Sequence, residues 1–187
     1  MKHVIYIIIL LFFSCNSENA LDCFQKSGAI ITKEVVMPAF NTILVNRNIE
    51  LIVTDKEEQR ITIEAGENLI SDITVGVINN QLILTDNNTC NYVRNYRPTR
   101  IYVDTPNLTE VRSSTQYDVK SNGVLSYPNL KIISEDFGKS DLFTVGDFRL
   151  DIDTESFSVV FNNISACYVS GQTSRLNLNY AIRFLKF

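Results

Sequence analysis

The sequence of 187 residues contains no tryptophan and only one histidine, His3. His3 stands before the apolar run 4–13 ("VIYIIILLFF"), which has the length and composition of the hydrophobic part of a secretory signal. Removal of that signal would leave a chain without any imidazole group. Catalysis by Ser-His-Asp or Cys-His groups is therefore excluded, as are metal sites that use histidine.

Long hydrophobic runs are scarce as well. The run 4–13 has ten residues, whereas a helix needs about 20 to cross the hydrocarbon core of a membrane. It leads into Ser14 and Cys15, an order that resembles a bacterial lipobox, in which a peptidase cuts before the cysteine and a diacylglycerol is attached to its sulfur. We expect a signal peptide at 1–14, lipidation of Cys15 and a tether at 15–28, so that the membrane is the first partner. The alternative is an ordinary signal peptide with a cysteine nearby.

Positive charge is limited and dispersed. The chain has 17 lysine and arginine residues against 21 aspartate and glutamate residues, for a net charge of −4. Loss of Lys2 with the signal would take this to about −5. A nucleic-acid-binding protein needs a basic patch, and none is present, so nucleic acid is not expected as a partner. No basic cluster is available to hold an anionic membrane either, so the lipid would be the anchor.

Cysteine usage fits an exported protein. The chain has four cysteines, and lipidation of Cys15 would leave three in an oxidising compartment. Cys167 stands at an apolar strand position and is expected to remain a buried thiol. Cys23 and Cys90 are then the candidate disulfide, which would tie the tether to a loop. Sequence alone does not fix disulfide connectivity.

Helical periodicity is nearly absent, and the chain predicts an all-β fold. Short segments rich in isoleucine, valine and threonine alternate between apolar and polar residues, which is typical of half-buried strands. Asparagine and glycine turns separate them, at 46–48, 66–68 and 79–80. The predicted strands cover 40–46, 48–54, 60–66, 71–79, 80–86 and 99–106.

A repeat begins after Pro106. Four segments that start "PNLTEV", "PNLKII", "DFRLDI" and "SACYVS" place Leu108, Leu130, Leu150 and Val169 at matching positions, about 20 residues apart. Each coil would bury its aliphatic face against its neighbours. We therefore predict that residues 29–187 form a single domain, a parallel β-solenoid similar to a right-handed β-helix. The alternative is a β-sandwich of short strands.

Several motifs resemble the head GIN domain family (DUF2807), autotransporter-adhesin-like lipoproteins of Bacteroidetes. They are the opening "FNTILVNRNIELIVT", the turn "EAGENLI", the loop "NTCNYVRNY" and the coil start "TPNLTEV", and the resemblance covers roughly 29–180. It implies a β-helical protein of the bacterial envelope without catalytic activity. We expect no cofactor, and a location in the outer membrane, facing the cell surface or the periplasm.

The resemblance also implies an incomplete C-terminal end. Such proteins continue with further coils, whereas this sequence ends in "IRFLKF" after "SRLNLNYA". An uncapped solenoid exposes apolar residues and strand edges. Either Phe184, Leu185 and Phe187 cover that end, or the chain is a truncated or divergent member of the family. A partner could also cover the end, and self-association through it is one such arrangement.

The loop 87–98 ("NNTCNYVRNYRP") holds the candidate ligand-binding residues. In an extended segment, Tyr92, Arg94 and Tyr96 project to one side, with the guanidinium between two rings, and Arg97 projects to the other. This would make a platform for a glycan or a peptide. The alternative is a structural loop whose rings pack on the domain.

A second candidate is "RLDIDTES" (149–156), in which Asp151, Asp153 and Glu155 share one face of a strand. Such a row could bind Ca²⁺ or act as an acid and base on a glycan. We favour a solvated outer face over buried Leu150 and Ile152, and expect neither a metal site nor catalytic residues.

Three functions follow from these patterns. The first is a lipid-anchored envelope protein that binds or adheres to a glycan or protein without catalysis. The second is a carbohydrate-active enzyme on the same scaffold, using Asp151 and Asp153. The third is a structural subunit of an envelope assembly.

Overall fold

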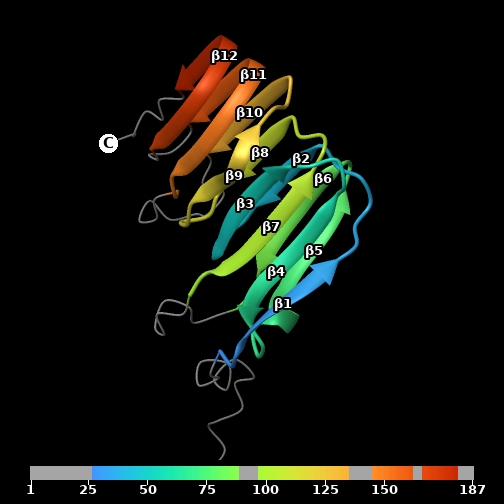
Figure 1. Ribbon diagram of the computed structural model, residues 1–187. Helices are drawn as coiled ribbons and strands as arrows, with labels where there is room; N and C mark the ends of the chain where they lie inside the picture. The colour runs from blue at the N-terminus through green and yellow to red at the C-terminus, as the bar shows by residue number, and fades with distance from the viewer. Residues whose placement is uncertain (1–26, 89–96, 135–144, 162–165, 181–187) are drawn as a thin grey trace, which may run out of the picture.

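The computed structural model describes residues 27–88, 97–134, 145–161 and 166–180 (Figure 1). In these ranges the chain forms twelve strands and one short 3₁₀ helix, η1 (Ile70–Asp72). No helix in them has the length and apolar character that a membrane span requires. The strands are β1 (Ile30–Val35), β2 (Thr42–Val45), β3 (Ile49–Asp55), β4 (Arg60–Gly66), β5 (Ile73–Ile78), β6 (Gln81–Asp86), β7 (Thr99–Thr105), β8 (Glu110–Ser113), β9 (Val119–Leu125), β10 (Asn129–Ser134), β11 (Phe148–Phe161) and β12 (Cys167–Tyr180).

All twelve strands belong to one sheet. Its order is β1-β4-β7-β3-β9-β11-β10-β8-β2-β6-β5, and β12 pairs with β11 beside this path. The sheet is mixed but mostly parallel, and it curves nearly into a barrel. The antiparallel pairs are β1 with β4, β4 with β7, and β5 with β6. In Figure 1 these lie at one end of the stack of strands, and β12 lies at the other.

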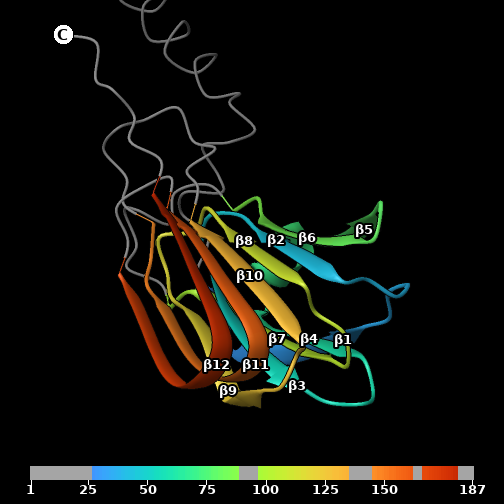
Figure 2. The ribbon, with the colours of Figure 1, turned by 90° about the horizontal axis from the view of Figure 1, so that it is seen from above.

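The long strand β11 turns the sheet from one side of the molecule to the other. Its residues 148–152 pair in parallel with β9, and its residues 156–161 pair in parallel with β10. We call the side made by β7, β3, β9 and the start of β11 the first flank. The side made by β6, β2, β8, β10 and the end of β11 is the second flank. Figure 2 shows the two flanks facing each other.

The hydrophobic core fills the space between the flanks. Along β7 the side chains alternate between buried and half-buried, as they do along β6, because successive residues of a strand point to opposite faces. Branched aliphatic residues suit this pleated surface, and full burial of one such side chain contributes about 1.5–3 kcal/mol. The core residues with no measurable exposure are Ile43, Val45, Ile49, Leu51, Leu82, Leu84, Ile101, Val103, Ile132 and Phe148.

The all-β prediction is confirmed, and the strands form one sheet where a sandwich would have two. The predicted turns are present too. Asn48 has φ 70°, and the consecutive Asn79 and Asn80 have φ 51° and 62°. Two adjacent residues with positive φ are what a tight antiparallel hairpin requires, and they join β5 to β6.

The predicted phase of the repeat is wrong in part. Leu150 and Val169 are register partners on the first flank, as expected. Leu130, however, lies on the second flank in β10, and its partner in the next pass of the chain is Phe157. Leu130 and Leu150 therefore do not occupy matching positions. The two flanks carry the same alternating pattern, so periodicity does not tell them apart.

Gly171 provides a test of the contact between β11 and β12. Its φ is +102°, and a Cβ at this position would collide with the carbonyl oxygen of Ile152. We predict that Gly171→Ala lowers the free energy of unfolding by about 1–3 kcal/mol, measured by chemical denaturation. The matched control is Gly76→Ala in β5, because nothing lies within 4 Å of a Cβ built there. Equal effects of the two substitutions would contradict the packing described.

A candidate binding surface

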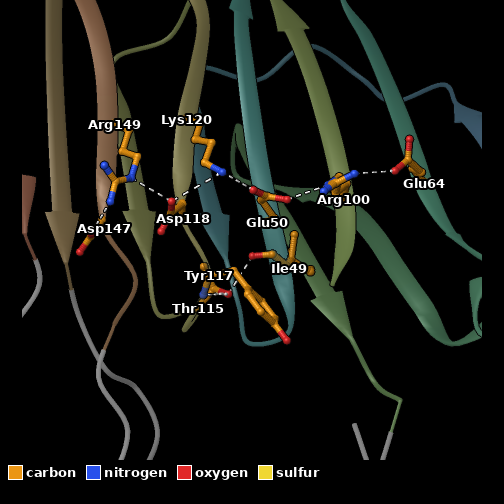
Figure 3. A network of polar contacts seen from close by, with 10 residues as sticks. All are labelled: Ile49, Glu50, Glu64, Arg100, Thr115, Tyr117, Asp118, Lys120, Asp147 and Arg149. Carbon is orange, nitrogen blue, oxygen red and sulfur yellow. Dashed lines mark hydrogen bonds and ion pairs between the residues drawn. The ribbon is translucent and has the colours of Figure 1, made fainter. Parts of the chain in front are cut away.

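Seven charged side chains of alternating sign form a row across the outer face of the first flank (Figure 3). They lie outward because their neighbours in the strands point inward: Glu50, for example, stands between the buried Ile49 and Leu51. We call this set the charge row. In spatial order its members are Glu64, Arg100, Glu50, Lys120, Asp118, Arg149 and Asp147.

Each member of the charge row is bonded to the next. The Arg100 guanidinium donates through Nε to Glu50 at 2.7 Å and through Nη1 to Glu64 at 3.2 Å. The Lys120 ammonium donates to the other oxygen of Glu50 at 2.5 Å and lies 3.6 Å from Asp118. These contacts join four strands side by side, and they require the register in which Glu50 stands opposite Arg100.

The row ends at Arg149 in β11. Its Nε donates to Asp118 at 3.0 Å and its Nη2 donates to Asp147 at 2.8 Å. The turn that carries Asp118 is itself fixed from beneath, because the buried hydroxyl of Thr115 donates to the carbonyl of Ile49 at 2.7 Å. Four carboxylates face three cations, so the row almost neutralises itself. It is therefore a structural feature and a poor site for a charged ligand.

Glu50 is the central member of the row and is only 9% exposed. Burial acts to raise the pKa of its carboxyl, but hydrogen bonds from Lys120 and then Arg100 outweigh burial, and the pKa is lowered. The hydrogen bond to Glu50 is in turn the main reason that the pKa values of Lys120 and Arg100 are raised. The folded state therefore favours the ionised form of all three groups.

Beyond the charge row, Arg149 meets an aromatic ring. Its guanidinium carbon lies 4.3 Å from the centre of the Tyr168 ring in β12, within the range of a cation–π contact. Tyr168 is 54% exposed. Beside it is a shallow hollow of about 610 Å³, which we call the Tyr168 hollow. Its lining includes Ser121, Arg149, Leu150, Asp151, Cys167, Tyr168, Val169 and Ser170.

An irregularity in β9 shapes this hollow. Arg149 pairs with Lys120, but Asp151 pairs with Val124, so β9 contains extra residues between two consecutive pairs. Gly123, in this segment, has φ +91°. The hydroxyl of Ser121 accepts a hydrogen bond from the amide of Asp151 at 2.8 Å, which holds the bulged segment against β11. Bulges of this kind redirect side chains and are common beside functional sites.

The predicted ligand-binding loop lies mostly outside the described residues. Tyr92, Arg94 and Tyr96 are not described, and Arg97 is exposed just before β7. The described ends of the loop connect β6 on the second flank with β7 on the first. They are held by the buried carboxylate of Asp86, which accepts hydrogen bonds from the Thr99 hydroxyl at 2.7 Å and the Asn88 amide at 2.8 Å.

The predicted lipidation site and disulfide also lie outside the described residues. The lipidation of Cys15 and the disulfide between Cys23 and Cys90 therefore stay predictions. Cys167 is described as a free thiol and is half-buried, not fully buried as expected. The reason is its place in β12, which has a neighbouring strand on one side in the described structure. Burial, followed by the charge of Asp147, raises the pKa of this thiol to about 11.

The predicted carboxylate row lies on the outer face of β11. Leu150 and Ile152 are buried, whereas Asp153 is exposed and accepts a hydrogen bond from Gln172 at 3.0 Å. Asp151 is half-buried and lines the Tyr168 hollow. The solvated outer face favoured from the sequence is thus present. Among the described residues, no group of three histidine, cysteine, aspartate or glutamate side chains is arranged to hold a metal ion.

Reasoning from the sequence missed the pairing of Arg149 with Tyr168. The two residues are register partners in β11 and β12, 19 positions apart in the chain. The same offset relates all the register pairs described between these strands, including Leu150 with Val169. The predicted match of Leu150 with Val169 already implies this pair one residue earlier, so the signal was present in the spacing.

Comparisons with known proteins identify the family. A family model described as "Putative auto-transporter adhesin, head GIN domain" (DUF2807) matches residues 39–182. The chain therefore belongs to the head GIN domain family, as its motifs predicted. No curated protein sequence matches it.

Solved structures share the fold at low sequence identity. A "putative adhesin" from Bacteroides fragilis has a TM-score of 0.62 at 15% identity, over 81% of this chain and 93% of that one. A "putative adhesin" from Parabacteroides merdae has a TM-score of 0.53 at 16% identity, over 82% and 78%. A "putative lipid binding protein" from Parabacteroides distasonis has a TM-score of 0.58 at 13% identity, over 82% and 63%. These likenesses establish the fold.

The charge row predicts how stability depends on Glu50. We expect Glu50→Gln to lower the free energy of unfolding at neutral pH by about 1–3 kcal/mol, because two cations lose their shared buried partner. The control is Glu58→Gln. The Glu58 side chain is 85% exposed, and its carboxylate lies 3.8 Å from the Arg60 guanidinium, which is long for an ion pair. Exposed pairs of this kind contribute little.

The comparison of the wild type with Glu50→Gln also predicts how the stabilisation by Glu50 depends on pH. The pKa of Glu50 is lowered from 4.5 in the folded state. Its contribution is therefore complete above the pKa of the unfolded chain and is lost as the pH falls through the folded value. The difference in stability between the wild type and Glu50→Gln should shrink below about pH 4.5. A difference that stayed constant down to low pH would show that the charge of Glu50 is not responsible.

Proposed function

We propose that this protein is a non-catalytic binding module of the bacterial envelope. It is exported, held by a lipid on Cys15, and contacts a glycan through the Tyr168 hollow. The observation that carries this proposal is the exposed ring of Tyr168 beside Arg149, Asp151 and hydroxyl groups on one rigid face. Membership of a family of adhesins supports an exported, surface-associated role.

The stacked passes of the chain are interpreted as coils of a β-solenoid. A right-handed winding is expected, because parallel strands joined by crossovers have this hand in nearly all proteins. Such a scaffold suits a binding role, because contact residues on packed strands keep their geometry without a ligand. Arg149 is held by Asp118 and Asp147, and Ser121 by the backbone of β11.

The chemistry of the hollow favours a neutral glycan over an anionic one. The positive charge of Arg149 is already matched by two carboxylates, and Asp151 adds a further negative charge nearby. An acidic sugar would meet repulsion there. A neutral sugar can lie on the apolar face of the ring and exchange hydrogen bonds with carboxylate and hydroxyl oxygens. A shallow hollow predicts weak single contacts, which many copies on one membrane would strengthen.

The alternative of a carbohydrate-active enzyme is less well supported. It requires two carboxylates that face one sugar from suitable positions. Asp151 lines the hollow, whereas the Asp153 carboxylate accepts a hydrogen bond from Gln172 in the next strand. The loop 87–98 remains a second candidate for the ligand contact.

The hollow can be tested by removing its ring. We predict that Tyr168→Ala weakens binding to neutral glycans by roughly tenfold or more, since truncation of a tyrosine that anchors a partner costs about 2 kcal/mol. Glycan arrays followed by titration calorimetry measure this. The matched control is Tyr102→Ala in β7, an outward tyrosine whose hydroxyl bonds to Glu64, and it should bind normally.

Two outcomes of this experiment would count against the hollow. One is unchanged glycan binding by Tyr168→Ala when circular dichroism shows a folded protein. The other is loss of glycan binding in the double variant Tyr92→Ala/Tyr96→Ala but not in Tyr168→Ala. That result would place the ligand contact in the loop 87–98.

The lipid anchor has its own test. Cys15→Ala should move the protein from the membrane fraction to the soluble exported fraction, because one acyl-bearing residue supplies the attachment. The control is Cys23→Ala, which leaves the expected lipidation site intact. Membrane fractionation unchanged by Cys15→Ala would rule out this anchor.

A further inference from the structure

The β12 end of the sheet is open. β12 pairs with β11 along its length, and no other described strand pairs with it. Its inward side chains are exposed although they are apolar: Leu176 is 55% exposed and Leu178 is 67% exposed. Together with Ile152, Phe157 and Val159 of β11, they line a groove of about 320 Å³ between the two flanks. The hydrophobic core thus extends to the β12 end of the sheet, where its apolar side chains are exposed.

The edge of β12 lacks the usual protection against pairing. Natural edge strands are short, or carry charges, prolines or bulges that block a further strand. β12 has fourteen residues with no proline, and Arg175 is its one charged residue. The edge strands at the other end of the stack, β1 and β5, have six residues each. A long edge with a single charge, beside an apolar groove, is suited to pairing with a further strand.

The polar groups of β12 are suited to a copy of themselves. Ser170, Gln172, Asn177 and Asn179 each carry groups that can both donate and accept hydrogen bonds. Two of them already continue a ladder from β11, since Gln172 donates to Asp153 at 3.0 Å and Asn177 donates to Ser158 at 3.3 Å. An interface with two-fold symmetry needs such self-complementary groups, because each patch meets an identical patch.

We propose that the β12 end binds the same end of a second copy of this chain. A two-fold axis across the edge reverses the direction of the strand, so β12 of one copy pairs antiparallel with β12 of the other. Leu176 and Leu178 of both copies then close a shared core. The fourteen residues have a contour length of about 46 Å, bent where β12 follows β11 from one flank to the other. With the groove, they offer on the order of the 800 Å² per partner that a stable interface buries.

This arrangement fixes where the two β1 strands lie. β1 and β12 are at opposite ends of the stack in Figure 1. The dimer therefore places its two β1 strands at opposite ends. The contact between copies does not itself depend on the lipid or on glycan binding.

The test is the molecular mass in solution of the mature chain, which is produced without its signal and with Cys15→Ala. Sedimentation equilibrium should give a dimer at micromolar concentrations. The double variant Leu176→Glu/Leu178→Glu should be monomeric, because four carboxylates would face each other in the dimer. The control is Ile78→Glu in β5, which is 61% exposed at the other end and should stay dimeric.

If the double variant fails to fold, hydrogen exchange of the wild type tests the dimer instead. In the wild type, the amides of β12 should exchange at least tenfold faster when dilution separates the dimer. A wild type that is monomeric at all concentrations, or a folded double variant that stays dimeric, would overturn the proposal. So would exchange at β12 that is independent of concentration, which would indicate cover by the chain's own C-terminal residues. Glycan binding is measured separately on immobilised protein, so failure of either proposal leaves the other testable.

Discussion

The structure depends on the pairing of β11 with strands of both flanks. The first half of this strand continues the parallel stack of the first flank and its second half continues that of the second. This pairing closes one side of the core and sets the register of every outward side chain on the later strands. The Arg149 end of the charge row, the cation–π contact at Tyr168 and the open groove at β12 all follow from it. A shift of one residue in β11 and β12 would turn Arg149 and Tyr168 inward.

Much of the fold could be predicted from the sequence, because its signals are local. Alternation gave the strands, and Asn48, Asn79 and Asn80 marked turns that need positive φ. The phase of the repeat could not be found in this way. Leu130 and Leu150 begin strands with the same pattern on different flanks, and only pairing between distant strands distinguishes them. The contact of Arg149 with Tyr168 was within reach of the sequence, because the predicted match of Leu150 with Val169 also places these two residues opposite each other.

The outer and inner faces of the sheet carry different kinds of information. Solved structures at 13–16% identity share the fold, because an alternating apolar pattern is enough to build the core. Outward residues are not constrained by packing, so they can differ among proteins of this fold. In this chain they divide into a self-neutralising charge row and a hollow with an exposed ring. The first stabilises the sheet, and the second offers groups that remain available to a ligand.

The most direct test of the central claim is to observe the hollow while a glycan binds. Nuclear magnetic resonance can follow the ring of Tyr168 and the Nε–H of Arg149 during titration with a neutral oligosaccharide. The account predicts saturable shifts at these two groups and at the amides of β12 beside them, with none at Arg97. Shifts confined to Arg97 and the loop 87–98, with Tyr168 unchanged, would contradict it.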